Sequence, residues 1–210
     1  MVYIRIDIVN KEEYETADDY REIKILIPRD SEDLERDFEY LGLDYRNLDI
    51  QDSHIKECEI ICKNDPAFAS DLSDVLNMLI DRASDSGYTT PFNDMKVLHQ
   101  LLDNIKISDR DKLLAVLKTE RERIANIKDV IKFTKSIDEY YLDSDSHSLE
   151  EFAENEILLG ELHMEDVISY IDLKSLGKDL IKQRNGKLTE YGVLGRMDEG
   201  MENSEEEEFE

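Results

Sequence analysis

One histidine and two cysteines stand four residues apart, at His54, Cys58 and Cys62. On a helix this spacing would place three soft ligands on one face, as a zinc site requires. Residues 57–62 are instead rich in branched side chains and predict a strand, on which four residues span about 13 Å. Residues that far apart cannot share a metal ion. We therefore expect two reduced, half-buried thiols here and no metal.

Adjacent carboxylates that a hydrolase could use as acid and base recur along the chain, at Glu150–Glu151, Glu165–Asp166 and Asp18–Asp19. Acidic residues are so abundant that each pair is better explained as part of a solvated face. A third pattern, Asp143 and Asp145 with Glu154 at the twelfth position, resembles a calcium-binding loop. Ser148 replaces the glycine that such a loop needs at its sixth position, so we expect no calcium site.

Familiar catalytic motifs are absent from the sequence. It contains no glycine-rich phosphate loop, no Gly-x-Ser-x-Gly and no His-Glu-x-x-His, and none of its four histidines has a local partner at a convincing spacing. The sequence therefore predicts a protein that is not an enzyme and that binds no cofactor.

Short strands and helices would have to position any functional side chain. Residues 2–9 alternate with a period of two and predict a strand, residues 10–19 a polar turn, and residues 22–27 a second strand that Pro28 stops. Ser31 is the expected cap of a helix over residues 32–40, and residues 48–51 and 57–62 predict further short strands. Residues 1–64 thus predict a small N-terminal α+β domain.

The middle of the chain, residues 65–135, predicts a helical domain. Apolar residues at helical spacing predict one helix from Ser70 or Asp71 to Gly87 and another over residues 95–105. A third helix is expected from Ser108, with an apolar face that extends to Ile124, and Asn126 is the expected cap of a fourth.

Residues 136–197 predict an acidic C-terminal α+β domain. A short strand is expected over residues 140–142, and Ser148 opens a capping box for a helix to about Ile157. Residues 164–170 and 173–181 predict helices, followed by a turn at Gly186 and one or two closing strands over residues 187–194. Residues 198–210 predict a disordered acidic tail. The expected fold class is α+β, with mixed sheet and helix at both ends of a helical middle.

Negative charge dominates the composition. The chain of 210 residues has 52 Asp or Glu against 26 Lys or Arg, a formal net charge of −26. Residues 136–173 hold 12 acids and no Lys or Arg, whereas residues 106–135 hold 5 acids and 9 bases. This excess repels nucleic acid and anionic lipid, and it attracts basic surfaces such as the phosphate-binding grooves of DNA enzymes. The basic stretch could pair with acidic faces of the same chain or of a dimer, could contact a partner, or could be a solvated helix face.

Carboxylates three or four residues apart on a helix lie about 5–6 Å from one another, a spacing that could imitate the phosphates of DNA. An acidic surface without a specific partner would have the same composition. The carboxylates that we predict to bind a partner lie in residues 30–62 and 136–173: Asp44, Asp49, Asp52, Asp138, Glu139, Asp143, Asp145, Glu150, Glu151, Glu154, Glu161, Glu165 and Asp166.

Several strings resemble the ArdA-type antirestriction proteins of plasmids, conjugative transposons and phages. Residues 158–162, Leu-Leu-Gly-Glu-Leu, resemble a Leu-Leu-Gly-Glu string of that family. Residues 170–172 and 176–180 resemble its Tyr-Ile-Asp and aromatic-Gly-Arg-Asp-Leu strings, although Leu176 and Lys178 depart from the pattern. The matching positions are Leu158, Leu159, Gly160, Glu161, Tyr170, Asp172, Gly177 and Asp179. Residues 25–30, Ile-Leu-Ile-Pro-Arg-Asp, and residues 48–52 resemble N-terminal strings of the same family.

The resemblance implies three small domains in an elongated, dimeric molecule that mimics bent DNA and inhibits type I restriction–modification enzymes. We therefore expect a DNA-mimic inhibitor of a host defence nuclease, with a CRISPR effector as the alternative target. An acidic chaperone or scaffold for basic proteins remains a separate hypothesis, as does an enzyme with a carboxylate site. The expected partner is a protein with a basic groove, with no direct contact to nucleic acid or membrane. The sequence has no apolar run as long as a membrane span and no signal peptide, so we expect a cytoplasmic protein of the bacterial host cell.

Overall fold

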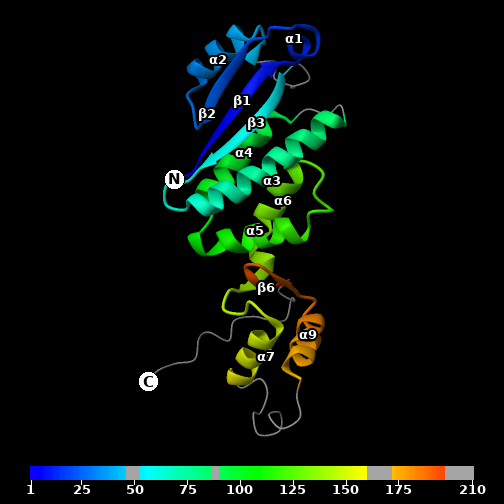
Figure 1. Ribbon diagram of the computed structural model, residues 1–210. Helices are drawn as coiled ribbons and strands as arrows, with labels where there is room; N and C mark the ends of the chain where they lie inside the picture. The colour runs from blue at the N-terminus through cyan, green and yellow to red at the C-terminus, as the bar shows by residue number, and fades with distance from the viewer. Residues whose placement is uncertain (46–52, 87–89, 160–171, 197–210) are drawn as a thin grey trace, which may run out of the picture. The chain divides into compact units, whose positions relative to one another are not determined.

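The computed structural model describes residues 1–45, 53–86, 90–159 and 172–196 (Figure 1). These residues form a mixed α/β protein with two small, three-stranded antiparallel sheets. The chain divides into two compact units. Unit 1 comprises residues 1–110 and 120–135, and unit 2 comprises residues 111–119 and 136–210. This division does not confirm the predicted three-domain arrangement. The predicted first domain and most of the predicted middle domain lie in one unit, whereas residues 111–119 of the middle domain belong to the other.

The sheet of unit 1 has the strand order β2-β1-β3. It contains β1 (Tyr3–Asn10), β2 (Glu22–Ile27) and β3 (Ser53–Ile61). The strands predicted over residues 2–9 and 22–27 are confirmed, and the third begins four residues earlier than predicted. The apolar alternation buries Ile4, Ile6 and Ile8 on one face. The strand predicted over residues 48–51 lies outside the described residues.

The opposite face of this sheet is charged and paired across the strands. Arg5 lies 2.6 Å from Glu59 on β3, and Lys24 of β2 lies 2.8 Å from Asp7. The hydrogen bond from Lys24 to Asp7 raises the pKa of the lysine. Such cross-strand pairs stabilise a sheet and leave this face polar without adding free charge.

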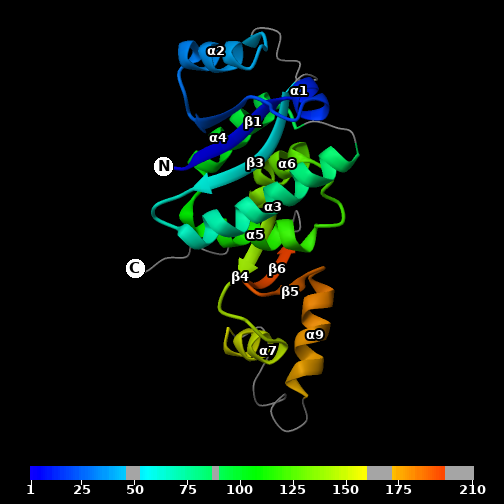
Figure 2. The ribbon, with the colours of Figure 1, turned by 45° about the horizontal axis from the view of Figure 1, so that its top comes forward.

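Unit 1 contains the helices α3 (Pro66–Asp85), α4 (Phe92–Asn104) and α6 (Ile127–Lys135). Helix α3 packs along β3, and α4 contacts both β1 and α6 (Figure 2). The Asn77 side chain of α3 bonds both peptide groups of Cys58, at 2.8 and 2.9 Å, and the Ser73 hydroxyl accepts the Ile60 N–H at 2.8 Å. These bonds satisfy backbone groups of an edge strand that would otherwise be open to another chain.

Most predicted helices are confirmed, but some of their ends differ from the prediction. Helix α3 starts at Pro66 rather than at Ser70 or Asp71, because the Asp65 carboxylate accepts the Phe68 N–H at 3.1 Å and proline fits the first helical position. The helix α5 (Arg110–Thr119) follows the 3₁₀ turn η2 (Ile107–Asp109) and ends five residues before Ile124. The predicted extension of its apolar face to Ile124 was therefore wrong, although Ile124 is buried.

Two further helices lie at the other end of unit 1, α1 (Lys11–Thr16) and α2 (Ser31–Tyr40). The turn predicted over residues 10–19 was therefore partly wrong, because Asn10 caps α1. Helix α2 begins at Ser31 itself, with Asp30 at the cap position and no side-chain cap bond. It buries Leu34 and Phe38, and the Phe38 ring meets Phe92 of α4 edge-on at 5.2 Å between centroids.

Unit 2 contains α5 apart from its first residue, the short turn η3 (Ile137–Glu139), and a sheet of order β4-β6-β5. Its remaining described elements are β4 (Tyr140–Asp143), α7 (Leu149–Leu158), α9 (Leu173–Gln183), β5 (Lys187–Thr189) and β6 (Gly192–Arg196). These confirm the predicted short strand, the helix after Ser148, the helix that begins at residue 173 and the two closing strands.

Helices α7 and α9 approach each other closely at Gly177. A Cβ atom at this position would lie 1.9 Å from the carbonyl oxygen of Leu149. Near the same interface the Arg184 guanidinium makes a two-pronged contact with the buried Glu156 carboxylate, 2.9 Å from Nη1 to Oε1. Phe152, Ile181 and Val193 form the apolar core beside them.

Asp94, in the first turn of α4, has a poorly satisfied carboxylate. Its Oδ2 atom is buried and has no hydrogen-bond partner in the described part of the chain. Burial raises the pKa of Asp94 above its ordinary value, although Lys128 acts in the opposite direction. A raised carboxyl pKa means that the folded protein binds this proton more tightly than the unfolded chain does.

We expect Asp94→Asn to raise the melting temperature at pH 7. The native carboxyl opposes folding when it is charged, and this penalty disappears as the pH falls through the raised folded pKa and then the unfolded pKa. The gain should therefore shrink between pH 7 and about pH 4, near the ordinary Asp pKa. Thermal melts at a series of pH values measure it, with Asp74→Asn on the exposed side of α3 as the control. A gain that is constant with pH would exclude titration of Asp94 as its cause.

Candidate functional site

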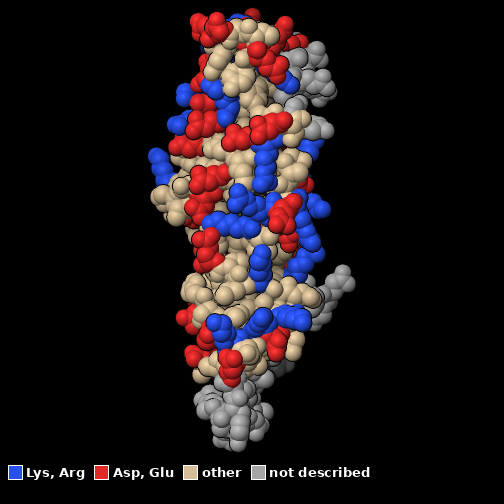
Figure 3. Space-filling view, turned by 45° about the vertical axis from the view of Figure 1, so that its right-hand side comes forward, with Lys and Arg blue, Asp and Glu red and all other residues tan. Residues whose placement is uncertain are grey.

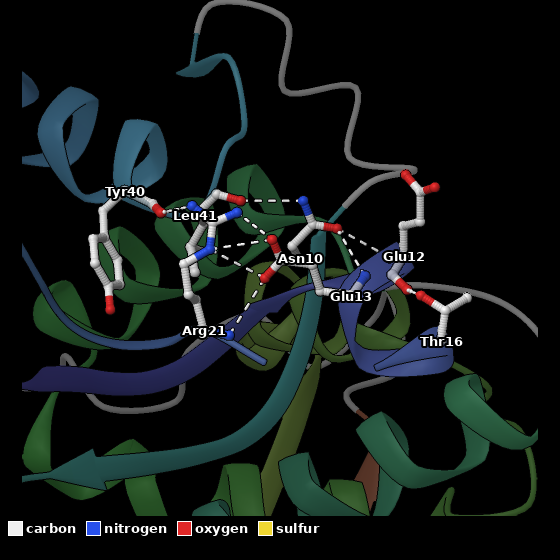
Figure 4. Close-up of polar contacts among 7 residues, drawn as sticks. All are labelled: Asn10, Glu12, Glu13, Thr16, Arg21, Tyr40 and Leu41. Carbon is white, nitrogen blue, oxygen red and sulfur yellow. Dashed lines mark hydrogen bonds and ion pairs between the residues drawn. The ribbon is translucent and has the colours of Figure 1, made fainter. Parts of the chain in front are cut away.

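A network of polar side chains fixes α1 against the end of α2 (Figure 4). The Arg21 guanidinium, just before β2, contacts the Glu13 carboxylate and donates to the Tyr40 carbonyl at 2.5 Å. The Asn10 side-chain amide donates to the Leu41 carbonyl at 3.1 Å. Two segments about thirty residues apart in sequence are thus held together by side chains that reach backbone oxygens.

Within α1 the same network determines which carboxylates remain available. The Asn10 amide oxygen accepts the N–H groups of Glu12 and Glu13, which caps the helix. The hydrogen bond from Arg21 lowers the pKa of Glu13, whose charge is thereby paired. Glu12 is exposed and forms no ion pair with any described residue, whereas Glu15 lies 3.8 Å from Lys11.

The exposed face of α2 carries acidic residues at helical spacing. Glu32, Glu35 and Glu39 follow one another at intervals of three and four, which places them on one face. Leu34 and Phe38 lie on the buried face and orient the helix. Two other acids of this segment are neutralised, since Asp33 contacts Arg36 and Asp37 lies 2.8 Å from Arg29.

We define the N-terminal acidic surface as the exposed carboxylates of α1, α2 and their adjoining loops. Its members are Glu12, Glu15, Asp18, Asp19, Asp30, Glu32, Glu35, Glu39 and Asp44. Acidic side chains predominate at this end of unit 1 in the face shown in Figure 3. Among the described residues, Glu12, Asp18, Asp19, Asp30, Glu32 and Glu39 have no ion-pair partner. Of the nine carboxylates of the N-terminal acidic surface, only Asp44 was predicted from the sequence as a binding residue.

The predicted carboxylates of α7 are the best placed of those in unit 2. Ser148 caps the helix by accepting the Glu151 N–H at 3.1 Å, and the Glu151 carboxylate accepts the His147 N–H at 2.7 Å. Glu154 is exposed one turn further along, and Glu150 is partly exposed. The predicted capping box is therefore confirmed at Ser148, but its glutamate reaches back one residue further than predicted.

Other predicted carboxylates of unit 2 are partly committed to local contacts. Asp143 accepts the Asp145 N–H at 3.0 Å and the Ser146 hydroxyl at 2.6 Å, so it closes a turn. Glu139 lies 3.7 Å from Arg196, and Asp138 and Asp145 are exposed. The remaining predicted positions lie outside the described residues: Asp49, Asp52, Glu161, Glu165, Asp166 and the motif residues Gly160 and Tyr170.

The residues that match strings of the antirestriction family lie, where the structure describes them, at a helix cap, at a contact between helices or on the surface. Asp172 caps α9 by accepting the N–H groups of Lys174 and Ser175, and the hydroxyl of Ser175 lowers the pKa of the carboxyl group. Gly177 forms the close approach to α7. Asp179 is exposed, and Leu158 and Leu159, at the end of α7, are also exposed. None of these described residues places one potential catalytic side chain next to another.

Helix α9 also carries a row of bases. Lys174, Lys178 and Lys182 recur every four residues and are exposed, and none of them has an ion-pair partner in the described part of the chain. This side of unit 2 is positive, so the described part of the unit is less uniformly acidic than residues 136–173 alone. Lys118 is different, because it bonds Glu190 at 2.5 Å and Tyr191 at 2.7 Å.

Metal ligation finds no support among the described residues. No group of three His, Cys, Asp or Glu side chains is placed to hold an ion there. Cys58 and Cys62 are unpaired thiols, as predicted, but both are buried more deeply than the expected half-burial. Burial raises the pKa of the Cys58 thiol, which favours the unreactive protonated form.

Comparison with known proteins does not identify a relative. No protein-family model matches the sequence, and no curated protein matches it at a significant level. Among the described residues, no helix is both long enough and apolar enough to cross a lipid bilayer.

Proposed function

We propose that this protein is a DNA mimic that occupies the DNA-binding groove of a host defence nuclease, most specifically a type I restriction–modification enzyme. The observation that carries the proposal is the N-terminal acidic surface. Its carboxylates lie on two helices that the Asn10–Arg21 network joins and on the adjoining loops, and six of them have no ion-pair partner in the described part of the chain. Carboxylates on α7, chiefly Glu151 and Glu154, would extend the mimicry in unit 2.

The spacing of these carboxylates supports the proposal physically. Neighbouring positions along the exposed face of α2 are about 5–6 Å apart. A groove that binds DNA presents lysine and arginine side chains to a row of phosphates, and a fixed row of carboxylates can occupy the same side chains. Because the helix is anchored by Leu34 and Phe38, its side chains lose less freedom on binding than those of a disordered acidic segment would.

The first test removes charge from α2 without altering its buried face. We expect Glu32→Gln/Glu35→Gln/Glu39→Gln to weaken inhibition roughly 10-fold or more, because three exposed charge pairs contribute about 1–3 kcal/mol together. The matched control, Asp74→Asn/Asp81→Asn/Glu122→Gln, removes the same charge from other exposed positions of unit 1. Inhibition of plasmid cleavage by a panel of type I enzymes and CRISPR effectors provides the measurement.

Competition and salt dependence test the mimicry itself. Binding to the target should weaken as salt rises and should be displaced by duplex DNA. Binding that persists in saturating duplex DNA would contradict mimicry of the DNA site. Equal losses in the α2 variant and its control would indicate general charge attraction. Inhibition of a CRISPR effector alone would keep the mimicry and change the target.

The acidic tail favours a second candidate, a chaperone or scaffold for basic proteins. Residues 198–210 contain eight acidic residues and no basic residue. Deleting them should leave most nuclease inhibition intact if the helices carry the function, whereas a chaperone should lose its activity. The homodimer that the family resemblance implies remains part of the proposal, and light scattering of the full chain measures it.

A further inference from the structure

A cavity of about 570 Å³ lies in unit 1, where the end of α3 meets the starts of α4 and α6. This volume is within the range of small-molecule sites. Its apolar wall includes Ala83, Pro91 and Ile127, and its polar groups include Arg82, Thr90 and Lys128. The cavity is separate from the N-terminal acidic surface, and the proposed function makes no use of it.

Two bases line this cavity. Arg82 belongs to the last turn of α3 and Lys128 to the first turn of α6, and neither forms an ion pair within the described ranges. Lys132 and Lys135 follow on α6 and add positive charge outside the cavity lining. In a chain with a net charge of −26, these bases are the groups that could attract a small anion to the cavity.

Thr90 adds a hydroxyl group to the polar part of the lining, and its exposed fraction is only 6%. A hydroxyl donor in the same lining as an arginine and a lysine is suited to an oxygen of a phosphate or carboxylate group.

Two acids also line the cavity, Asp85 and Asp94. They oppose an anion, so the site would admit one only where the arginine and lysine are closer to it than the carboxylates.

We propose that this cavity binds a small organic molecule with a phosphate or carboxylate group. Arg82, Lys128 and the Thr90 hydroxyl hold the oxyanion, and the carbon part of the molecule packs against Ala83, Pro91 and Ile127. The two head groups share one recognition chemistry, and two probes distinguish them.

The probes are phenyl phosphate and benzoate, with benzyl alcohol as the uncharged control, titrated at constant ionic strength into the full-length ¹⁵N-labelled protein. We expect saturable shifts of amide signals at the end of α3 and the starts of α4 and α6 with at least one of the two anions. Whichever anion binds more tightly identifies the head group. If neither anion saturates, or if benzyl alcohol binds as well as they do, the proposal is wrong.

Variants distinguish a specific anion site in the cavity from a general attraction of anions to lysine side chains. Arg82→Gln and Lys128→Gln should each weaken binding roughly 10-fold or more, since each removes a charged hydrogen-bond donor. Lys132→Gln, which removes the same charge from the same helix outside the cavity lining, should leave affinity within about twofold, because Lys132 donates no hydrogen bond to the bound oxyanion and salt weakens its remaining attraction. Equal losses in all three would refute the site. Thr90→Ser should keep the affinity and Thr90→Val should lose it, and both should match the parent in thermal melts.

Discussion

Replacing Gly177 with alanine is expected to destabilise unit 2 by about 2–3 kcal/mol, the upper range for overpacking a well-packed site. The added Cβ would lie 1.9 Å from the Leu149 carbonyl oxygen, far inside van der Waals contact. That oxygen belongs to the backbone of α7 and cannot rotate away as a side chain would. The two helices would have to separate, which opens the core around Phe152 and Ile181.

The direction of the stability change distinguishes a packing clash at Gly177 from an effect of helix propensity. In an exposed helix, glycine to alanine stabilises by about 1 kcal/mol because alanine has the higher helix propensity. Lys178→Ala, at the neighbouring exposed position, provides the reference for propensity alone. Urea unfolding and hydrogen exchange of the α7 and α9 amides measure both variants. A Gly177→Ala protein as stable as its parent would mean that the two helices are not held at this distance in solution.

Replacing Arg184 with methionine is expected to cost about 3 kcal/mol or more, as removal of one partner from a buried ion pair usually does. Glu156 is only 4% exposed, and the arginine contacts both of its oxygens. Without the guanidinium, the carboxylate would be left buried without its counter-charge. The guanidinium also lies 5.7 Å from the centre of the Phe152 ring, so some packing would be lost as well.

The double variant Glu156→Leu/Arg184→Met distinguishes these contributions. Replacing both partners with apolar residues removes the buried charge, so we expect it to restore most of the stability that Arg184→Met loses. Denaturant unfolding of the two single variants and the double variant forms a mutant cycle. If the double variant were as unstable as the sum of the single ones, the two side chains would not be coupled.

Much of the fold follows from local patterns in the sequence. Alternation over residues 2–9 predicts β1 because each second side chain enters the core, and Ser148 predicts the start of α7 because its hydroxyl accepts a backbone N–H. The start of α3 was readable in principle from Asp65 and Pro66, a cap followed by the one residue that suits the first helical position. Helix α1 gave a weaker signal, because its six residues bury no side chain.

The candidate site was less predictable, because ion pairing decides which carboxylates are free. Counting acids favoured residues 136–173, but Asp143 and Glu139 are engaged locally and α9 adds three unpaired lysines to the described part of unit 2. Conversely, nothing local shows that Arg21 reaches the carbonyl oxygen of Tyr40. That contact joins segments that only the tertiary structure brings together, and it is what unites α1 and α2 in one acidic surface.

The close approach at Gly177 also predicts how relatives of this protein would vary. The contact is with the backbone of residue 149 and does not depend on the side chain there, whereas position 177 admits only glycine while the helices keep this distance. Positions 156 and 184 should change together, from an ion pair to two apolar residues, and seldom one at a time. A search that weights an unchanging glycine and this covarying pair above the acidic residues would recognise distant members of the lineage in which overall identity has been lost.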